Sequence, residues 1–350
     1  MKKKIIWIVG LIVVLILLTT YWSQDKQKGE RIKIGVVAPL QGGATVYGEN
    51  LVKGMELAIK DLDKNIELIV EDDSGNPAKS ASAAQKLINI DKVDAIVTIT
   101  SGTGNAVAPV AEQAGIVHVC DCVDTSIAKN NGYLYSVLPQ EEADKWLKEA
   151  QSRNIKNVSL IIQNHPGANL IAEEVKKGAE KYGVNLINIE TIESSQRDFK
   201  TTVSKVKDEN ADIYFAIVFP PTLEILAREM KNQGINNFSS VGLLAISSDL
   251  TIFEDQWYTD NYLSDLGYQK RFEEEYPGTR FNVRSAPHGY DILTMFVKGL
   301  ETGNLNDYMK NLYSYDGKAG SCVREEGTNI FKLPLGIWKI DDGKINMVQE

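Results

Sequence analysis

Short unbroken runs of apolar residues alternate along the chain with longer segments in which apolar residues recur at every third or fourth position. An unbroken run is typical of a buried strand, whereas the longer spacing is typical of an amphipathic helix. The first pair is a strand over residues 32–39 and a helix over residues 48–62, with Leu51, Met55 and Ala58 on one face. Further strands are expected at 66–71, 95–100, 116–120, 158–163, 185–192 and 213–219, and helices at 78–88, 107–114, 170–182, 199–209, 223–233 and 289–299.

This alternation occurs as two series, one ending near residue 120 and the other beginning at residue 158. Repeated strand–helix units predict the α/β class, with parallel sheets that carry helices on both faces. About 320 residues follow the first thirty or so, which exceeds one ordinary core and suits two lobes. Residues 335–340 and 344–348 flank Asp341-Asp342-Gly343 and predict a closing β-hairpin.

The first 31 residues follow a different pattern and read as a targeting segment with a short tether. Three lysines at positions 2–4 precede an uncharged, largely apolar run at 5–22. As a helix this run spans about 27 Å, close to the thickness of the hydrocarbon core of a bilayer. The leading positive charge predicts that the rest of the chain lies outside the cytoplasm. The run ends in Tyr21 and Trp22 instead of a small-x-small site, which favours an uncleaved membrane anchor over the alternative, a cleaved signal peptide.

Composition narrows the function classes. The net charge is -9 and the sequence shows no basic stripe, which argues against a nucleic-acid-binding protein. Three cysteines do not make a disulfide framework. Cys120 and Cys122 are too close in an extended strand to bond each other comfortably. One of them could pair with Cys322, and free or buried thiols are the alternative.

Six segments, taken in order, resemble the type I periplasmic binding proteins of the leucine-binding, branched-chain amino-acid receptor kind. They include IKIGVVAPLQGGATVYGENLVKGMELAI at the start and HGYDILTMFVKGLE near the end. The other four lie at residues 67–88, 93–119, 197–218 and 316–327, so the resemblance covers nearly everything from residue 32 onward. It implies an α/β fold of two doubly wound, Rossmann-like lobes with parallel sheets, joined by a hinge of three chain segments.

The resemblance also implies lobe limits and a function. Lobe 1 would hold residues 32–138 and 256–336, and lobe 2 would hold residues 139–255 and 337–350. A ligand cleft would lie between the lobes, at the carboxyl ends of the strands. The protein would then be an extracytoplasmic receptor that closes on a small, amino-acid-like ligand for the membrane permease of an ABC transporter. A ligand-sensing ectodomain without a transporter is the alternative.

Small residues crowd two loops, 41–44 and 100–105, each between an expected strand and a helix. Small side chains let a ligand reach the free backbone N–H groups at a helix start, where the helix dipole favours an anion. In the family that the chain resembles, the second loop holds the carboxylate of an amino acid. The resemblance thus implies this role for Ser101, Gly102 and Thr103. A plain helix cap without a ligand is the alternative.

Five further residues are implied as parts of the ligand site. Tyr47 stands where the family has a tyrosine that borders the pocket, and a core aromatic is the alternative. Cys122 and Asp124 lie in the loop after the fourth expected strand. His165 and Phe219 follow two of the expected strands of lobe 2.

The acceptor for a ligand ammonium group departs from the family, because Leu244 stands where a lobe 2 carboxylate is usual. An unpaired ammonium enclosed in a cleft is very unfavourable, so some acceptor is needed. Asp124 is the expected replacement, with Asp121 in reserve. The alternative is that Asp124 only caps the following helix, because Asp before Thr125 and Ser126 is good capping sequence.

Other chemistries are weaker interpretations. His118, Cys120, Cys122 and Asp124 alternate along one side of an extended chain, but such neighbours rarely converge on a metal ion without a second segment. Residues 102–107 lack the third glycine of a dinucleotide-binding loop. With three histidines and no recognisable general-base constellation, we expect no enzyme, no cofactor and no bound metal.

Overall fold

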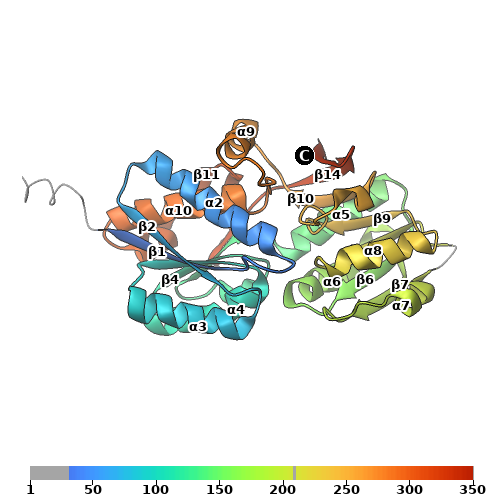
Figure 1. The fold of residues 1–350 in the computed structure, drawn as a ribbon, viewed down its shortest axis with the longest axis horizontal. Coiled ribbons are helices and arrows are strands. Elements are labelled where there is room, and N and C mark those ends of the chain that lie inside the picture. The colour runs from blue at the N-terminus through green and yellow to red at the C-terminus, as the bar shows by residue number, and fades with distance from the viewer. Residues whose placement is uncertain (1–30, 208–209, 350) are drawn as a thin grey trace, which may run out of the picture.

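The computed structural model describes residues 31–207 and 210–349, and it has two lobes, each built on one β-sheet (Figure 1). The apolar run predicted as a membrane anchor, residues 5–22, lies outside the described residues. Within the described ranges, no helix has both the length and the apolar character that crossing a membrane requires.

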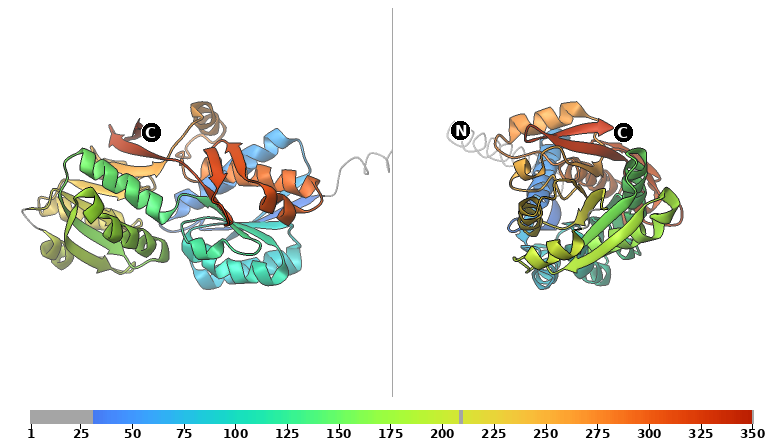
Figure 2. Two further views of the ribbon diagram at one scale, coloured as in Figure 1. Left: turned by 180° about the vertical axis from the view of Figure 1, so that it is seen from behind. Right: turned by 90° about the vertical axis from the view of Figure 1, so that its right-hand side faces the viewer.

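The first lobe contains an eight-stranded sheet in the order β11-β12-β13-β5-β4-β3-β1-β2. Its parallel strands are β1 (Ile32–Ala38), β2 (Ile66–Asp72), β3 (Ala95–Ile99), β4 (Val117–Asp121), β5 (Gly132–Ser136) and β13 (Ile330–Lys332). Antiparallel β11 (Ser314–Gly317) and β12 (Gly320–Arg324) extend one edge, in orange-red in Figure 2. Its helices are α2 (Thr45–Leu62), α3 (Pro77–Lys86) with a π-helical turn (Leu87–Asp91), α4 (Ser101–Ala114), α10 (Ala286–Glu301) and α11 (Leu305–Asn311).

Alternating side chains on β1 explain why helices cover both faces of this sheet. Ile34 and Val36 belong to the large hydrophobic core that also contains Leu51 of α2. Val37 points the other way, into a second core that contains Leu87 at the end of α3. Because successive side chains of a strand face opposite sides, a strand with apolar residues on both sides needs cover on both.

The second lobe repeats the arrangement with a seven-stranded sheet in the order β15-β14-β10-β9-β8-β6-β7. Its parallel strands are β6 (Asn157–Gln163), β7 (Asn185–Ile192), β8 (Ile213–Ile217), β9 (Phe238–Val241) and β10 (Trp257–Asn261). The hairpin of β14 (Leu335–Asp341) and β15 (Lys344–Gln349) is antiparallel. Its helices are α5 (Pro139–Ser152), α6 (Pro166–Gly178), α7 (Lys200–Val206) and α8 (Thr222–Asn232).

Both sheets place the first five strands of their series in one order, β2-β1-β3-β4-β5 and β7-β6-β8-β9-β10. This is a doubly wound order, in which ligands bind at the carboxyl ends of the strands. The prediction of two doubly wound α/β lobes is therefore confirmed. The sheets are mixed and not wholly parallel, because the late strands of each series add antiparallel edges.

The second chain crossing differs from the expected lobe limit between residues 255 and 256. Strand β10 lies beyond that limit, yet it pairs in parallel with β9 and antiparallel with β14 of the seven-stranded sheet. Trp257 is buried there and stacks near Trp146 of α5, with ring centroids 5.6 Å apart. The crossing to the first lobe therefore follows Asn261, because these aromatic side chains pack together within the second lobe.

The segment after that crossing contains α9 (Leu266–Glu275) and returns to the first lobe. The Tyr268 hydroxyl of α9 donates a hydrogen bond to the carbonyl of Ala286, at the start of α10. Figure 1 shows α9 above the junction of the lobes, on the same side of the molecule as β14. The β14–β15 hairpin predicted around Asp341-Asp342-Gly343 is present.

Candidate functional site

A cavity lies where the carboxyl ends of strands from both lobes meet, and we call it the cleft cavity. It leaves about 60 Å³ for the centres of water-sized spheres. Strands β3, β4, β8 and β9 contribute their last residues, Ile99, Asp121, Ile217 and Val241. The remaining lining residues are Tyr47, Thr100, Ser101, Cys122, Val123, Ser136, His165, Gly167, Ala168, Ile171, Phe219, Gly242, Leu243 and Arg284.

Glycines allow the two lobes to meet closely around this cavity. A Cβ atom on Gly43 of the first lobe would lie 1.6 Å from the carbonyl oxygen of Pro220 in the second lobe. A Cβ atom on Gly167 of α6 would lie 3.3 Å from the Ser101 hydroxyl. The structure thus has its lobes closed on each other, and at Gly43 there is no room for any side chain.

Ser101 begins α4 and lines the cavity, as the resemblance implied, with a side chain that is almost fully buried. Thr100 precedes it as the helix cap, with its hydroxyl accepting from the backbone N–H of Thr103. Thr100 has φ of 75°, a conformation that costs a β-branched residue free energy and is found mostly at functional sites. The start of α4, with its free N–H groups and positive dipole end, therefore lies at the cavity.

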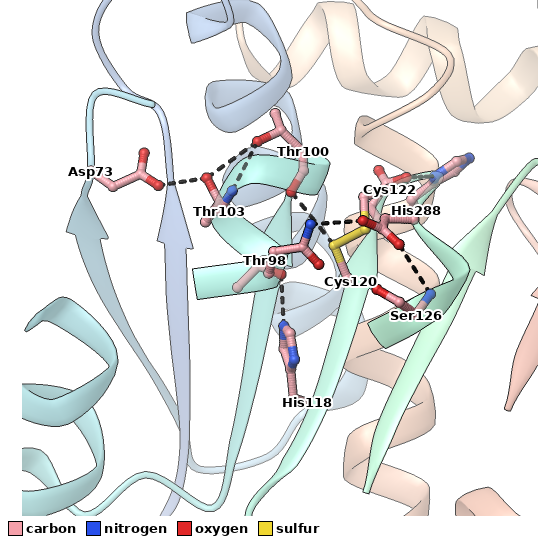
Figure 3. Close-up of a disulfide and its surroundings, with 12 residues drawn as sticks. Asp73, Thr98, Thr100, Thr103, His118, Cys120, Cys122, Ser126 and His288 are labelled. Carbon is pink, nitrogen blue, oxygen red and sulfur yellow. Dashed lines mark hydrogen bonds and ion pairs between the residues drawn. A yellow bond between two sulfur atoms is a disulfide. The ribbon is translucent and has the colours of Figure 1, made fainter. Parts of the chain in front are cut away.

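Gly102 and Thr103 are not among the residues that line the cavity. The Thr103 hydroxyl instead donates a hydrogen bond of 2.6 Å to the buried Asp73 carboxylate, as Figure 3 shows. The sequence grouped these two residues with Ser101 because a loop was expected up to residue 106. The helix begins at Ser101, six residues earlier than predicted, and its turn directs Thr103 towards β2 and away from the cavity.

Asp124 also lies outside the lining residues, and its geometry is that of the helix-cap alternative. Its carboxylate accepts a hydrogen bond of 2.7 Å from the Asn105 side chain and one of 3.0 Å from the backbone N–H of Ser126. Burial acts to raise the pKa of this carboxyl, but these hydrogen bonds hold it below the usual value. Asp124 is therefore occupied as an acceptor within its own lobe.

Asp121, the reserve candidate, lies at the end of β4 and lines the cavity. Its side chain is nearly inaccessible to solvent, at 3% exposure of the residue. The Nδ1 atom of His288 lies 3.0 Å from its Oδ1 atom, although the two groups are not aligned for a hydrogen bond. Neither carboxylate oxygen of Asp121 has a hydrogen-bond partner in the described residues, which leaves a buried acceptor at the cavity.

Arg284 lines the same end of the cavity but is already paired. Its guanidinium contacts Glu142 of α5 at 2.6 Å and Asp260 of β10 at 3.0 Å, and both carboxylates are fully buried. Burial raises the pKa of Glu142 despite the opposing effect of Arg284. Two buried carboxylates, those of Glu142 and Asp260, thus pair with one guanidinium, and Asp121 lines the same cavity as a further buried carboxyl group.

The wall formed by the second lobe is mainly apolar. The rings of His165 and Phe219 lie 4.6 Å apart between centroids. Burial lowers the pKa of His165 to about 4, so its ring is neutral at neutral pH, and Nδ1 accepts from the backbone N–H of Gly167. Tyr47 of α2 closes the cavity from the first lobe, and its hydroxyl donates to the carbonyl of Gly242 at 3.3 Å.

The expectation that Cys120 and Cys122 would not bond each other is wrong. The structure joins them by a disulfide with 5.4 Å between their Cα atoms, while Cys322 is free and buried. The expectation assumed an extended strand, but β4 ends at Asp121 and the chain bends at Cys122. Cys122 consequently lines the cavity as one half of a disulfide.

The structure therefore brings together five of the eight residues implied by the resemblance: Tyr47, Ser101, Cys122, His165 and Phe219. Sequence reasoning missed Arg284, whose only visible signal was a charged residue just before a strongly apolar helix. Among the described residues there is no group of three or more His, Cys, Asp or Glu side chains that could hold a metal ion.

Comparisons with known proteins agree with this geometry. The family described as periplasmic binding protein matches residues 31–308. The Leu/Ile/Val-binding protein homolog 3 of Brucella melitensis is 21% identical over 345 residues, which cover 90% of this chain and 92% of the relative. The Leu/Ile/Val-binding protein of Escherichia coli is 21% identical over 220 residues, and the match spans 59% of each chain.

Two solved structures show the same fold. The branched-chain amino acid transporter substrate binding protein LivJ of Streptococcus pneumoniae, in complex with isoleucine, has a TM-score of 0.81 and 18% identity. The match covers 92% of this chain and 100% of that one. A solute binding protein of an ABC transporter from Rhodopseudomonas palustris, in complex with 3,4-dihydroxybenzoic acid, has a TM-score of 0.78 and 19% identity. This match covers 91% of this chain and 96% of that one.

The family match extends over most of the chain, and its relatives are solute-binding proteins with the same two-lobe architecture. The chain therefore belongs to the periplasmic binding protein family, and it shares its two-lobe fold with the two solved structures described above.

Proposed function

We propose that the protein is an extracytoplasmic receptor whose lobes enclose a small polar, amino-acid-like ligand for an ABC-type importer. The observation that supports this most strongly is the cleft cavity, which both lobes form at the carboxyl ends of their strands. Close contacts between the lobes, such as that of Gly43 with Pro220, enclose it. A site split between two lobes holds its ligand only when they are together, which suits capture and release. The relatives named above bind Leu/Ile/Val or are described as parts of ABC transporters.

Two polar groups of the cavity suit the two charged groups of an amino acid. The start of α4 with Ser101 favours a carboxylate, because unpaired N–H groups and the helix dipole attract negative charge. Asp121 offers the ammonium acceptor for which Asp124 was first expected, because Asp121 lines the cavity and neither of its carboxylate oxygens has a hydrogen-bond partner among the described residues. The body of the ligand would contact Tyr47, Cys122, His165 and Phe219.

An aromatic acid without an amine, as in the Rhodopseudomonas palustris complex, fits this chain less well. Such a ligand would leave the Asp121 carboxylate buried without a hydrogen-bond partner among the described residues, which is unfavourable. The buried Asp121 carboxylate at the cavity therefore favours a ligand that carries a cationic group.

Calorimetry on the full-length chain tests the proposal with isoleucine and other amino acids, their deaminated acids and hydroxybenzoates. We expect binding of an amino acid and no measurable binding of its deaminated acid. Asp121→Asn should weaken amino-acid binding by about 10-fold to 100-fold, because a hydrogen bond to a charged group contributes about 1.5–3 kcal/mol. Asp124→Asn, in the same loop but outside the cavity, is the matched control and should bind normally.

Two outcomes would count against the proposal in different ways. Tight binding of a hydroxybenzoate, unaffected by Asp121→Asn, would retain the receptor function and overturn the amino-acid assignment. Normal uptake of the identified ligand by cells that lack the gene would overturn the link to an importer.

The proposed location outside the cytoplasm rests on the apolar run at 5–22, with the lobes held by an uncleaved anchor. Mass spectrometry of the protein from membranes should find this run intact. A mature chain that begins near residue 23 or 24 would show a cleaved signal and a released receptor instead.

A further inference from the structure

The disulfide between Cys120 and Cys122 lies in the wall of the cleft cavity, at the end of β4. Asp121, to which we assigned the ammonium group of the ligand, is the residue between the two cysteines. Asp121, Cys122 and Val123 all line the cavity. The disulfide therefore restrains a part of the wall that would contact the ligand.

The same disulfide packs against the start of α4, the other polar part of the site. The Cys120 Sγ atom lies 3.7 Å from the Thr100 carbonyl oxygen, as Figure 3 shows. A Cβ atom on Gly104 of α4 would lie 2.5 Å from that sulfur, so the missing side chain makes room for it. The disulfide thus contacts both of the segments, β4 and the first turn of α4, that carry Asp121 and Ser101.

This cross-link has a local effect and little effect on the fold as a whole. Its two cysteines are only 2 positions apart in the sequence. Closing so short a loop restrains the unfolded chain much less than closing a long one. Cys120 is in any case fixed by strand pairing, since it lies opposite Thr98 of β3 and Leu134 of β5. Without the disulfide we expect both lobes to stay folded and the chain from Asp121 onward to become freer.

Reduction of the disulfide requires a movement that the surroundings of Cys120 do not allow. Two thiol sulfurs keep van der Waals separation, which is longer than a disulfide bond. Cys120 is fully buried in β4 and its sulfur already meets α4, so it has no room to move away. Cys122 follows the strand and lines the cavity, so it is the cysteine that shifts. The wall of the cavity changes shape with it.

A thiol that reduces the disulfide has to come from solution and has to reach Cys122. The third cysteine does not attack from within, because burial raises the pKa of the Cys322 thiol to about 12 and the thiolate is the attacking species. The second lobe covers the loop, since a Cβ atom on Gly167 of α6 would lie 3.4 Å from Val123 Cγ2. Separation of the lobes would therefore uncover the disulfide at Cys122.

We propose that the disulfide is a redox switch of the cleft cavity, which binds its ligand tightly when Cys120 and Cys122 are oxidised and weakly when a dithiol has reduced them. The switch rests on the receptor function proposed above, because its output is the affinity of that site for its ligand. A thiolate of the dithiol attacks Cys122 Sγ, the bond to Cys120 breaks, and a mixed disulfide forms. The second thiol of the dithiol then displaces Cys122. The dithiol leaves as a cyclic disulfide, and its two protons and two electrons remain on the two cysteines as thiols.

The ligand and the disulfide then influence each other reciprocally. If reduction lowers the ligand affinity by a given factor, the bound ligand makes the disulfide harder to reduce by the same factor. A receptor filled with ligand would therefore stay oxidised under conditions that reduce the empty one.

Calorimetry with isoleucine on the full-length chain tests the switch, after oxidation in air and after treatment with dithiothreitol. Alkylation and mass spectrometry establish the redox state, with one free thiol expected in the oxidised chain and three in the reduced chain. Reduction should weaken binding by about tenfold or more, the effect of losing one hydrogen bond to a charged group, and reoxidation should restore it. The double variant Cys120→Ala, Cys122→Ala should bind as weakly as the reduced protein and should not respond to dithiothreitol. Cys322→Ala is the matched control and should keep the full response.

Hydrogen exchange of the ligand-free protein gives a measurement that does not depend on the ligand. Reduction should speed exchange at residues 121–126 and in the first turn of α4, while the second lobe exchanges as before. The melting temperature of the ligand-free protein should change little, because the cross-link closes so short a loop.

Three free thiols after oxidation in air, or equal affinities and exchange rates before and after reduction, would overturn the switch. A large fall in melting temperature on reduction would show that the disulfide stabilises the whole first lobe and would overturn it as well. Failure of isoleucine to bind even the oxidised protein would contradict the amino-acid assignment of the proposed function. Hydrogen exchange then decides about the switch alone, because faster exchange confined to the predicted residues supports it and unchanged exchange overturns it.

Discussion

Single residues at the ends of strands and the starts of helices decide what the cleft cavity can bind. Ser101 and Asp121 follow neighbouring strands, β3 and β4, and are almost fully buried. One lies at a helix start that favours negative charge, and the other brings negative charge of its own. A ligand that carries both an anionic and a cationic group can satisfy both preferences within one cavity.

Replacing Ser101 with Ala should weaken ligand binding by about 1.5–3 kcal/mol, the contribution of a hydrogen bond to a charged group. The fold should be little affected, because the cap of α4 is provided by the Thr100 side chain and not by Ser101. Calorimetry measures the affinity, and thermal melting of the ligand-free protein is the control. Unchanged binding in Ser101→Ala would remove Ser101 from the site.

His165 and His118 make stability depend on pH in a defined direction. Burial lowers the pKa of His165 to about 4 and that of His118 to about 3, against an unfolded value of about 6.5. Between pH 6.5 and 4 the unfolded chain therefore binds protons that the folded chain does not, so stability falls as the pH falls. Each histidine contributes a slope of up to about 1.4 kcal/mol per pH unit in this window.

Urea unfolding of the wild type and of His165→Gln at several pH values measures this effect. The variant should show a shallower loss of unfolding free energy between pH 6.5 and 4, because one of the two imidazoles with a lowered pKa is gone. Parallel curves for the two proteins would mean that His165 is protonated in the folded state and that its burial is not maintained in solution.

At the scale of elements, the sequence predicted the βα units well because their strands are unbroken apolar runs. Strand β7 and the β14–β15 hairpin fall where they were expected. Strand β10 was missed because its five residues include the polar Asp260 and Asn261, which are buried for reasons outside the strand itself. Asp260 is buried because Arg284 pairs with it, and no local pattern reveals a partner 24 positions away in the chain.

The site was predictable only where the family pattern extended to this chain. Ser101 and Tyr47 lie at the cavity as the resemblance implied, whereas Asp124 was chosen over Asp121 because it stood at the matching position. Which of these two carboxylates reaches the cavity depends on where β4 ends and on the disulfide bend at Cys122. The end of β4 and the bend at Cys122 depend on how other segments of the chain pack against this loop, so the residues of the loop alone do not reveal them.

The loop that contains Gly43 gives a prediction about closure. A methyl group on Gly43 would overlap the Pro220 carbonyl at 1.6 Å, and that contact exists between lobes and not within one. Gly43→Ala should therefore weaken ligand binding by about tenfold or more through faster dissociation, because affinity differences between related complexes lie mostly in the dissociation rate. The ligand-free protein should melt as the wild type does.

Stopped-flow release of the ligand measures the dissociation rate, with Gly102→Ala as the matched control. A Cβ on Gly102 would have its nearest contact, His165 Nε2, at an ordinary 3.9 Å, so this variant should behave as the wild type. Equal dissociation rates in Gly43→Ala and the wild type would show that ligand binding does not need the closed contact at Pro220.

For the whole molecule, the strongest electrostatic link between the lobes is the buried cluster around Arg284. Arg284 stands before α10 of the first lobe, while Glu142 and Asp260 belong to α5 and β10 of the second. Removing one partner of a buried ion pair leaves an uncompensated charge, which is far more costly than the net contribution of the pair. The cluster thus makes the stability of each lobe depend on the other.

Arg284→Met should lower the free energy of unfolding by about 3–5 kcal/mol at pH 7, since two carboxylates remain buried without their cation. Burial already raises the pKa of Glu142 against the effect of Arg284, and without Arg284 that pKa rises further. A carboxyl whose folded pKa is raised contributes stability at low pH that is lost as the pH increases through that pKa. The difference between wild type and variant should therefore shrink as the pH falls from 7 towards 5.

Urea unfolding measures this difference in unfolding free energy, with Arg228→Met as the control, because the exposed pair of Arg228 with Asp249 should contribute less than about 1 kcal/mol. A difference that stays constant with pH would mean that the loss comes from packing of the arginine side chain and not from the two carboxylates it pairs.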